Sequence, residues 1–196
     1  MHVLCSDLES VFLPELWVEV AERTGVEDLK LTTRDISDLD VLMEKRLTAL
    51  KENKIDFVKL QNIIQDCEPF KGAVDFLRWA AARMPVIILS DAFEEFVSPL
   101  LPKMNYPTVL CNSLEVDGQG AIVGYHIRPD GKRRTVAGLQ EAGLKVTAMG
   151  DSYNDTKMLA QADKGFLFNA SEKTARDFPQ FPIISDYEEL KKELSR

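Results

Sequence analysis

The sequence predicts an α/β protein in which a doubly wound parallel sheet is covered by helices on both faces. Short apolar runs alternate with segments of helical period, and most of these runs are continuous rather than alternately polar and apolar. Continuous apolar strands are typical of parallel sheets that are buried on both faces. The chain has 196 residues, which suits one domain or one domain that carries an insertion.

Six short apolar runs are the expected strands, namely residues 3–5, 86–89, 108–110, 146–149, 165–168 and 183–184. Segments of helical period lie between or after most of them, and these are the expected helices. They are residues 73–83, 94–104, 135–142, 155–161 and 187–194. This order of strands and helices indicates parallel pairing of the strands.

Two segments depart from the alternation. Residues 113–116 and 121–126 flank a turn with glycines at 118 and 120, which allow positive φ, so a β-hairpin is expected there. Residues 12–68 are helix-like and rich in charge, which predicts a helical insertion after the first strand.

Composition and charge exclude several classes of protein. With 24 basic and 32 acidic residues the net charge is −8, so nucleic-acid binding is not expected, although a locally positive site for a small phosphorylated substrate is compatible. A hydrophobic content of 45% excludes a disordered chain. Three widely spaced cysteines and two histidines exclude a structural zinc site and favour reduced thiols in the cytoplasm.

A membrane role is not expected either. No segment approaches the roughly 20 apolar residues that a membrane-spanning helix needs. The N-terminal segment reaches acidic residues at Asp7 and Glu9 without a basic region and a long apolar stretch before them, which is unlike a signal peptide. The cytoplasm is therefore the expected location.

Polar or acidic residues follow three of the expected strands. Asp7 and Glu9 follow the first strand, Ser90 and Asp91 follow the second, and residues 150–155 (GDSYND) follow the strand at 146–149. Ligands of open parallel sheets bind outside the carboxyl ends of the strands. We therefore expect these three strand ends to share one crevice.

Several acidic residues at these ends are suited to metal binding and acid–base chemistry. Asp7 and Glu9 are two residues apart and can point to the same side, one as nucleophile or metal ligand and the other as general acid or base. Together with Asp151 and Asp155 they would repel one another without a cation, and oxygen ligands favour Mg²⁺ over zinc. The alternatives are a solvated turn after the first strand and a polar loop in which Asn154 or Asp155 caps a helix.

Ser90 and Lys132 are candidate ligands for a phosphate group. Ser90 lies at a strand exit, where its hydroxyl can donate to a phosphate oxygen or cap the next helix. Lys132, with Arg133 and Arg134, opens a helix, where positive charge opposes the helix dipole. A nearby phosphate or acidic cluster would explain this placement, and a solvated basic turn is the alternative.

The helical insertion carries an apolar stripe at helical spacing, made up of Leu39, Leu42, Met43, Leu47 and Leu50. Arg46 falls on this stripe, where a charge needs a partner or ligand unless it reaches water from the edge. Asp35 and Asp38 are possible internal partners. Glu15 follows Pro14 and fits the first turn of a helix, where an acidic residue is favourable.

The order and spacing of these residues resemble the haloacid dehalogenase superfamily of aspartate-nucleophile phosphatases. Asp7-Leu8-Glu9 matches the first motif, Ser90 the second, Lys132 the third and residues 150–155 the fourth. The resemblance implies a Rossmann-like core domain of residues 1–11 and 69–196. Residues 12–68 would form a helical cap like that of phosphoserine phosphatases.

Within this superfamily the chain is similar to bacterial enzymes that combine phosphoserine phosphatase and homoserine phosphotransferase activities. The similarity runs nearly end to end and includes residues 31–36, 40–43, 86–91 and 177–182. Ser10 occupies a position where these enzymes have glycine, which is expected to stiffen the turn. The loop before Lys132 is about one residue shorter, so both Lys132 and Arg133 are candidates for the phosphate-binding cation.

The resemblance also implies catalytic and metal-binding roles. Asp7 would be the nucleophile and a Mg²⁺ ligand, and Glu9 would be the general acid and base, with its backbone carbonyl on the metal. Asp151 would be a further metal ligand, and Asp155 would support the metal shell.

The remaining candidates are implied to bind the substrate phosphoserine. Ser90, Asp91, Lys132 and Asn154 would lie around the phosphoryl group. In the cap, Glu15 would bind the amino end of the substrate, and Arg46 would bind its carboxylate end.

The implied reaction is attack by Asp7 on phosphorus to give an aspartyl-phosphate. Transfer to water makes the enzyme a phosphatase of serine biosynthesis, whereas transfer to homoserine makes it a phosphotransferase, and exclusion of water decides between them. The alternatives are a phosphatase of the same superfamily for another small phosphate ester, a two-component receiver domain and a catalytically silent scaffold. A receiver domain has no helical cap of the kind that residues 12–68 suggest.

Overall fold

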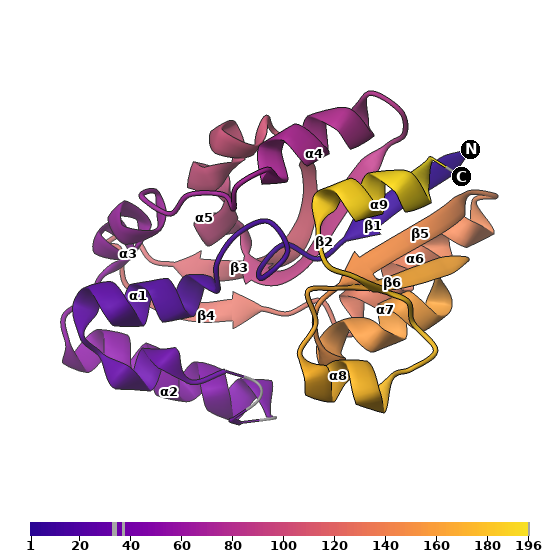
Figure 1. Ribbon diagram of the computed structural model, residues 1–196. Coiled ribbons are helices and arrows are strands. Elements are labelled where there is room, and N and C mark those ends of the chain that lie inside the picture. The colour runs from indigo at the N-terminus through magenta and orange to yellow at the C-terminus, as the bar shows by residue number, and fades with distance from the viewer. Residues whose placement is uncertain (33–34, 37, 196) are drawn as a thin grey trace.

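A seven-stranded sheet forms the centre of the computed structural model, which describes residues 1–32, 35–36 and 38–195 (Figure 1). The strand order is β4-β3-β2-β1-β5-β6-β7. The strands are β1 (His2–Ser6), β2 (Val86–Phe93), β3 (Thr108–Val116), β4 (Ile122–His126), β5 (Lys145–Gly150), β6 (Lys164–Phe168) and β7 (Ile183–Ile184). Neighbouring strands are parallel except for the antiparallel pair of β3 and β4. The predicted α/β class, with its parallel sheet and hairpin, is confirmed.

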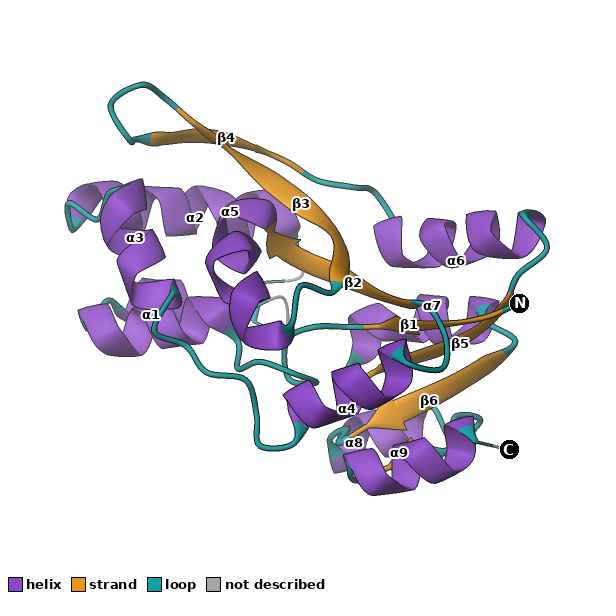
Figure 2. Ribbon diagram, turned by 90° about the horizontal axis from the view of Figure 1, so that it is seen from above, coloured by secondary structure: helices purple, strands orange, loops and turns teal. Residues whose placement is uncertain are grey.

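Helices cover both faces of the sheet (Figure 2). On one face lie α4 (Ala73–Ala81) and α9 (Tyr187–Leu194), and on the other lie α6 (Gly131–Glu141) and α7 (Thr156–Gln161). Each face has its own apolar cluster, and the central strand contributes to both. Leu4 of β1 belongs to the first cluster, whereas Val3 and Cys5 belong to the second. The continuous apolar runs of the sequence therefore reflect strands that are buried on both faces.

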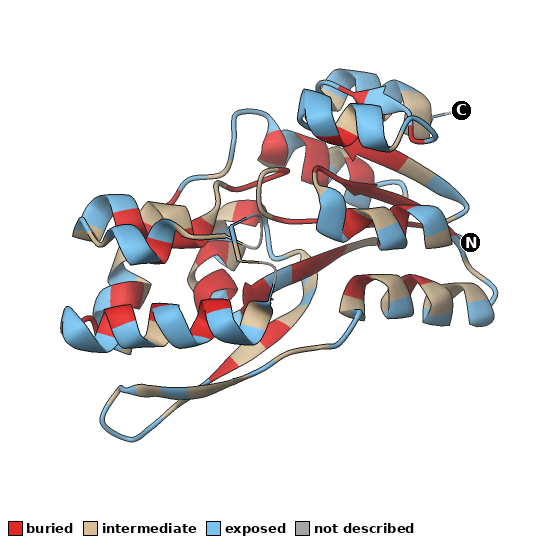
Figure 3. Ribbon diagram, turned by 90° about the horizontal axis from the view of Figure 1, so that it is seen from below, coloured by how far each residue is buried: buried red, intermediate tan, exposed pale blue. Residues whose placement is uncertain are grey.

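Burial along the strands follows this layered arrangement (Figure 3). β1 and β5 are buried after their first residue, whereas every residue of the edge strand β4 is exposed or half-buried. Among the described residues, no helix combines the length and apolar character that crossing a membrane requires. The buried strands β1 and β5 thus form the centre of the molecule, and their carboxyl ends are the place to look for a site.

The chain between β1 and α4 forms helices that gather at one end of the sheet, beside the β3–β4 hairpin (Figure 1). They are α1 (Leu16–Thr24), η1 (Glu27–Lys30), α2 (Leu39–Glu52) and α3 (Phe57–Ile64). Two hydrogen bonds join these helices to the hairpin. The Tyr125 hydroxyl donates to Asp40 Oδ1 over 2.8 Å, and the Phe57 amide donates to the Gly120 carbonyl over 3.1 Å.

Several element boundaries differ from the sequence prediction. β2 continues beyond residue 89 through Ser90 and Asp91, because it stays paired with β3 after a bulge. Residues 108–110 and 113–116 belong to the single strand β3, which pairs first with β2 and then with β4. α6 begins at Gly131 rather than at residue 135, and α4 ends at Ala81 rather than at residue 83.

The predicted helix over residues 94–104 is in fact a short α-helix followed by a 3₁₀ helix. α5 (Glu94–Val97) gives way to η2 (Ser98–Met104), which contains Pro99 and Pro102. Proline has no amide hydrogen to donate, so a regular α-helix does not continue through both positions. The helix α8 (Glu172–Asp177) was not predicted, and its N-cap is Ser171, whose hydroxyl accepts the Thr174 amide.

The close packing of β6 against α7 can be tested by its effect on stability. A Cβ atom on Gly165 would lie 2.5 Å from the Leu159 backbone oxygen, whereas one on Gly138 of α6 would meet nothing within 4 Å. We expect Gly165→Ala to lower the free energy of unfolding by about 1–3 kcal/mol through overpacking. Gly138→Ala should raise it by about 0.5–1 kcal/mol because alanine favours the helix. Urea denaturation measures both, and changes of the same sign would contradict the packing.

Candidate active site

The ammonium group of Lys132 lies among carboxylates from three parts of the chain. Its Nζ atom is 2.8 Å from Asp7 Oδ1, 2.8 Å from Asp155 Oδ1 and 3.3 Å from Asp91 Oδ2. Asp7 follows β1, Asp155 follows β5 and Asp91 lies in β2. Lys132, Asp7 and Asp155 are buried, whereas Asp91 is exposed. The three strand ends that the sequence predicts to share one crevice therefore meet at Lys132.

The start of α6 separates Lys132 from its basic neighbour. Asp130 adopts a left-handed conformation with φ 52°, and the helix begins at the next residue. This turn places Lys132 inside, while Arg133 stays on the surface and pairs with Asp130 over 2.5 Å. The geometry thus favours Lys132 over Arg133 as the cation of the site.

Burial and charge shift the pKa values of this group strongly. Burial alone would lower the pKa of Lys132, but the charges of Asp155, Asp7 and Asp91 raise it well above its usual value. Burial and the charge of Asp155 raise the pKa of Asp7 well above the usual range, although Lys132 opposes this. One buried cation therefore does not balance the carboxylates around it.

A compact turn after β5 fixes the orientation of Asp155. Its Oδ2 atom accepts the amides of Asp151 and Ser152, each over 3.1 Å, and the Ser152 hydroxyl completes a capping box. The carboxylate therefore caps the 3₁₀ turn η3 (Tyr153–Asp155). The sequence also allowed it to cap the next helix, α7, but α7 has no side-chain cap bond. Gly150 is required here, because a Cβ atom would lie 2.3 Å from Asp155 Cγ.

The acidic residues fit a hard divalent cation. Ligand oxygens of Asp7, Asp151 and Asp155 lie within 4.8 Å of one another, and all three residues are buried. Both oxygens of Asp155 are already engaged, one with Lys132 and the other with backbone amides. Carboxylate oxygens are preferred ligands of Mg²⁺, and excess negative charge in a buried site favours a cation.

Glu9 links the end of β1 to α1, the first of the helices between β1 and α4. Its Oε1 atom accepts the Leu16 amide over 2.7 Å, so the carboxylate lies at the N-terminus of α1. Burial and the charge of Glu15 raise the pKa of Glu9 to about 7, against the Leu16 hydrogen bond and the positive charges of Lys132 and Arg46. Such a carboxyl group carries a proton in part near neutral pH.

Ser10, at the position where glycine was expected, adopts a left-handed conformation with φ 60°. Serine is strained in this region, but its hydroxyl is used, since it donates to Glu15 Oε1 over 3.2 Å. This hydrogen bond holds Glu15, a candidate substrate-binding residue, beside the start of α1.

Arg46 lies in α2 and is buried, with 7% of its surface exposed. Its Nη2 atom donates to the Leu31 carbonyl over 2.7 Å, and its guanidinium stacks on Trp17, 4.6 Å from the ring centroid. Burial lowers the pKa of Arg46 to about 10, while the nearby charges of Glu9 and Glu15 raise it.

The two acidic residues considered as partners of Arg46 make local hydrogen bonds. Asp38 accepts two amides at the start of α2, and Asp35 accepts the amide of Thr32. Within the similar run at residues 31–36, Thr33 and Arg34 lie outside the described residues.

The other predicted residues lie in or beside the same cluster. Asn154 donates to Asp91 Oδ2 over 2.9 Å, and buried Ser90 accepts the Ala92 amide on its hydroxyl oxygen over 3.1 Å. Sequence reasoning missed Asn112, which donates to the Asp91 carbonyl over 2.8 Å. It also missed Trp17. The Asn112–Asp91 and Trp17–Arg46 contacts join residues far apart in the chain, and no local pattern signals them.

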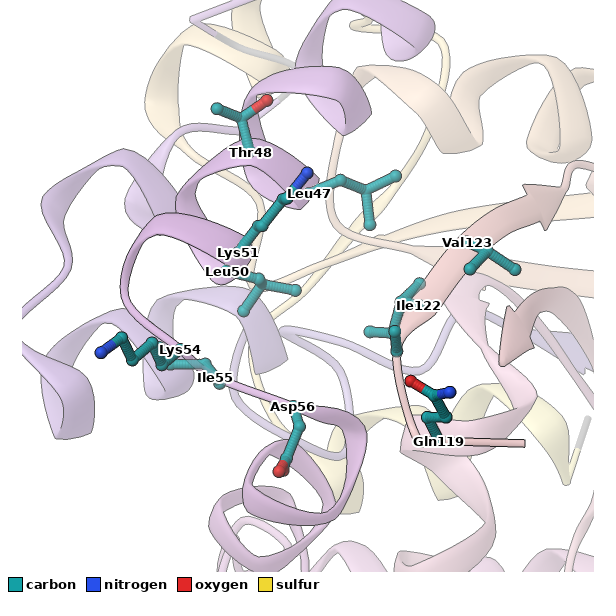
Figure 4. Close-up of a pocket in the computed structure, with 11 residues that line it drawn as sticks. Leu47, Thr48, Leu50, Lys51, Lys54, Ile55, Asp56, Gln119, Ile122 and Val123 are labelled. Atoms are coloured by element: carbon teal, nitrogen blue, oxygen red, sulfur yellow. The ribbon is translucent and has the colours of Figure 1, made fainter. Parts of the chain in front are cut away.

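A groove of about 600 Å³ lies between α2 with its following loop and the β3–β4 hairpin (Figure 4). Its described lining residues lie between Leu47 and Asp56 on one side and between Gln119 and Val123 on the other. They include none of the residues around Lys132. The groove is thus separate from the carboxylate cluster.

Known proteins resemble this chain in sequence and in fold. A family model for haloacid dehalogenase-like hydrolases matches residues 10–160. The chain belongs to this family. Two relatives are similar to this hydrolase along nearly its whole chain. Phosphoserine phosphatase ThrH of Pseudomonas aeruginosa is 47% identical over 194 residues, covering 98% of this chain and 95% of the relative. A phosphoserine phosphatase of Pseudomonas syringae pv. tomato is 45% identical over 194 residues, covering 98% and 82%.

Solved structures share the fold of this haloacid dehalogenase-like hydrolase. A phosphoserine phosphatase in apo form has a TM-score of 0.78 at 20% identity, covering 97% of this chain and 98% of that chain. A substrate-bound phosphoserine phosphatase complex has a TM-score of 0.75 at 19% identity, covering 99% and 97%.

The contacts of Lys132 give a stability prediction for the site. Lys132→Met leaves Asp7 and Asp155 buried without their cation, so we expect the free energy of unfolding to fall by about 3–5 kcal/mol in metal-free buffer. The matched change Arg133→Met removes a pair at the surface and should cost less than about 1 kcal/mol. Chemical denaturation measures both. Equal losses in the two variants would show that Lys132 does not hold the cluster together.

Proposed function

We propose that this enzyme is a Mg²⁺-dependent phosphoserine phosphatase that acts through an aspartyl-phosphate on Asp7. The observation that carries the proposal is the contact of buried Lys132 with Asp7 at the carboxyl ends of β1 and β5, with Arg46 buried in the neighbouring helices. Family membership and the two phosphoserine phosphatase relatives support it.

The proposed Mg²⁺ ligands are the carboxylates of Asp7 and Asp151 and the backbone carbonyl of Glu9. Asp155 would orient this group from the side, since its oxygens are held by Lys132 and two amides. When bound, the ion would offset the negative charge of the phosphoryl group during transfer.

In the first half of the reaction, Asp7 attacks phosphorus in line and the bond from phosphorus to the serine oxygen breaks. Glu9 gives its proton to that oxygen, which leaves as the serine hydroxyl. Lys132, the hydroxyl of Ser90 and the side chain of Asn154 hold the phosphoryl oxygens, with Asp91 positioning Asn154.

In the second half, Glu9 takes a proton from water, and the water oxygen attacks phosphorus. The bond between phosphorus and the Asp7 oxygen breaks, so phosphate leaves and the Asp7 carboxylate is restored. The position of Glu9 supports this double role, because its carboxyl group is held at the N-terminus of α1 with a pKa raised by burial.

The amino-acid part of the substrate would bind in the cap region. Arg46 is proposed to bind the carboxylate and Glu15 the ammonium group, because the cap region supplies one charge of each sign there. We propose that residues 12–68 form this cap and that residues 1–11 and 69–196 form the core.

Two extensions of the proposal concern the acceptor and the setting. Homoserine is proposed as a second acceptor, whose hydroxyl would replace water in the second half of the reaction. We also propose that the enzyme serves serine biosynthesis in the cytoplasm, in line with its three unpaired cysteines. Membership of a hydrolase family argues against a receiver domain, while another small phosphate ester is the remaining alternative substrate.

The direct test of the proposal is release of phosphate from phosphoserine, with and without Mg²⁺. We expect activity that depends on the metal, and formation of phosphohomoserine when homoserine is added. Asp7→Asn should abolish both activities while the far-ultraviolet circular dichroism stays native, because an amide forms no acyl phosphate. Turnover near the wild-type rate in this variant would rule out the mechanism.

Glu9→Gln separates proton transfer from structure. The glutamine oxygen can still accept the Leu16 amide, so the helix start should survive. The rate should nevertheless fall by about 10²–10⁴-fold, because the amide donates no proton to the leaving oxygen. Steady-state kinetics on phosphoserine give the result. A change in KM with kcat intact would make Glu9 a binding residue instead.

Arg46→Ala tests the choice of substrate. We expect KM for phosphoserine to rise about 10- to 100-fold, the effect of losing a charged hydrogen-bonded pair with the carboxylate. p-Nitrophenyl phosphate has no carboxylate, so its KM should change far less. Equal losses on both esters would mean that Arg46 serves the fold, and another phosphate ester would then become the better candidate substrate.

A further inference from the structure

The guanidinium of Arg46 is held from several sides by groups of the cap region. One face stacks on the indole of Trp17, with Cζ 4.6 Å from the ring centroid. In its plane, Nη2 donates to the Leu31 carbonyl over 2.7 Å, and Nη1 lies 3.9 Å from Met43 Sδ. The flexible arginine side chain is thus confined to one orientation.

One donor of the same guanidinium makes no hydrogen bond to the part of the chain that the structure describes. The Nε atom of Arg46 is buried and has no hydrogen-bond partner among the residues that the structure describes. A buried donor without a partner is costly, and a planar anion can satisfy two guanidinium donors at once. The stack therefore holds a guanidinium with a buried N–H group that no described residue satisfies.

Trp17 itself is fixed in place and lies close to the site. It is in the first turn of α1, next to Leu16, whose amide donates to Glu9. Its ring meets Phe96 of α5 edge to face, with centroids 4.9 Å apart and an interplanar angle of 61°, and only 7% of Trp17 is exposed. The indole is therefore a rigid platform that connects α1, α5 and Arg46 of α2.

We propose that Trp17 is a positioning residue for substrate recognition, because its indole holds the Arg46 guanidinium in the orientation that receives the substrate carboxylate. This inference rests on the proposed function. Trp17 is not proposed to touch the phosphoryl group or the metal-binding residues. Because the stack already fixes the Arg46 side chain, substrate binding costs less conformational entropy.

The test compares two esters in the full-length enzyme with Mg²⁺ present. Trp17→Leu removes the aromatic face, and we expect KM for phosphoserine to rise about 2- to 30-fold, the factor that a desolvated cation–π contact supplies. The effect on kcat, and on p-nitrophenyl phosphate, should be much smaller. Trp17→Phe keeps a ring face and should recover most of the affinity for phosphoserine.

A second arginine–tryptophan stack in the same chain is the matched control. Arg83 lies over Trp79 with Cζ 4.5 Å from the ring centroid, on α4 and the residues after it, and neither belongs to the proposed site. Trp79→Leu loses a stack with nearly the same centroid distance. Because this stack lies outside the proposed site, KM for phosphoserine should stay unchanged. Circular dichroism and thermal denaturation of all variants show whether each is folded.

A double variant shows whether Trp17 acts through Arg46. In the Arg46→Ala background there is no guanidinium to orient, so adding Trp17→Leu should raise KM little further. Independent, multiplicative effects would overturn the proposal, and so would equal losses on both esters. If Trp17→Leu does not fold, Trp17→Phe decides, since a selective small rise in KM supports the proposal and an unselective loss refutes it.

Failure of the inference is distinct from failure of the proposed function. A wild-type enzyme that releases no phosphate from phosphoserine overturns both. A wild-type enzyme that is active and selectively impaired by Arg46→Ala, but not by Trp17→Leu, overturns only the role of Trp17.

Discussion

The contact of one buried ammonium group with the carboxylates of Asp7 and Asp155 is the interaction on which the rest of the site depends. Lys132 reaches both over 2.8 Å from the first turn of α6. Without it, the ends of β1 and β5 would carry buried charges of the same sign side by side. With it, negative charge still exceeds positive charge, which suits the proposed uptake of Mg²⁺. Stability and chemistry therefore make opposing demands on the same few atoms.

A short segment joins the end of β1 to α1, the first of the helices that follow it. Glu9 accepts the first amide of α1, Ser10 turns the chain in a left-handed conformation, and Ser10 also donates to Glu15. The first turn of α1 then carries Trp17, on which Arg46 stacks. Residues proposed for proton transfer and for substrate recognition thus follow one another within a short segment. A shift of α1 would move both groups together.

The sequence could predict the features that depend on local pattern. Alternation of apolar runs with helical segments gave the layers, and polar residues at strand ends located the crevice. The sequence could not predict contacts between distant segments. Two examples are the hydrogen bond from Asn112 to the Asp91 carbonyl and the stack of Arg46 on Trp17, which depend on how strands and helices pack together. β2 was predicted too short because Ser90 and Asp91 resemble a loop. In residues 94–104 the local signal for the break is present, namely Pro99 and Pro102.

In the proposed reaction the phosphoryl group passes through Asp7. Rapid mixing of the Mg²⁺-loaded enzyme with phosphoserine, acid quenching and mass spectrometry of the N-terminal peptide test it most directly. We expect a phosphoryl group on Asp7 that appears within one turnover and disappears as phosphate is released. A phosphoryl group on another residue, or rapid turnover with none on the protein, would contradict it.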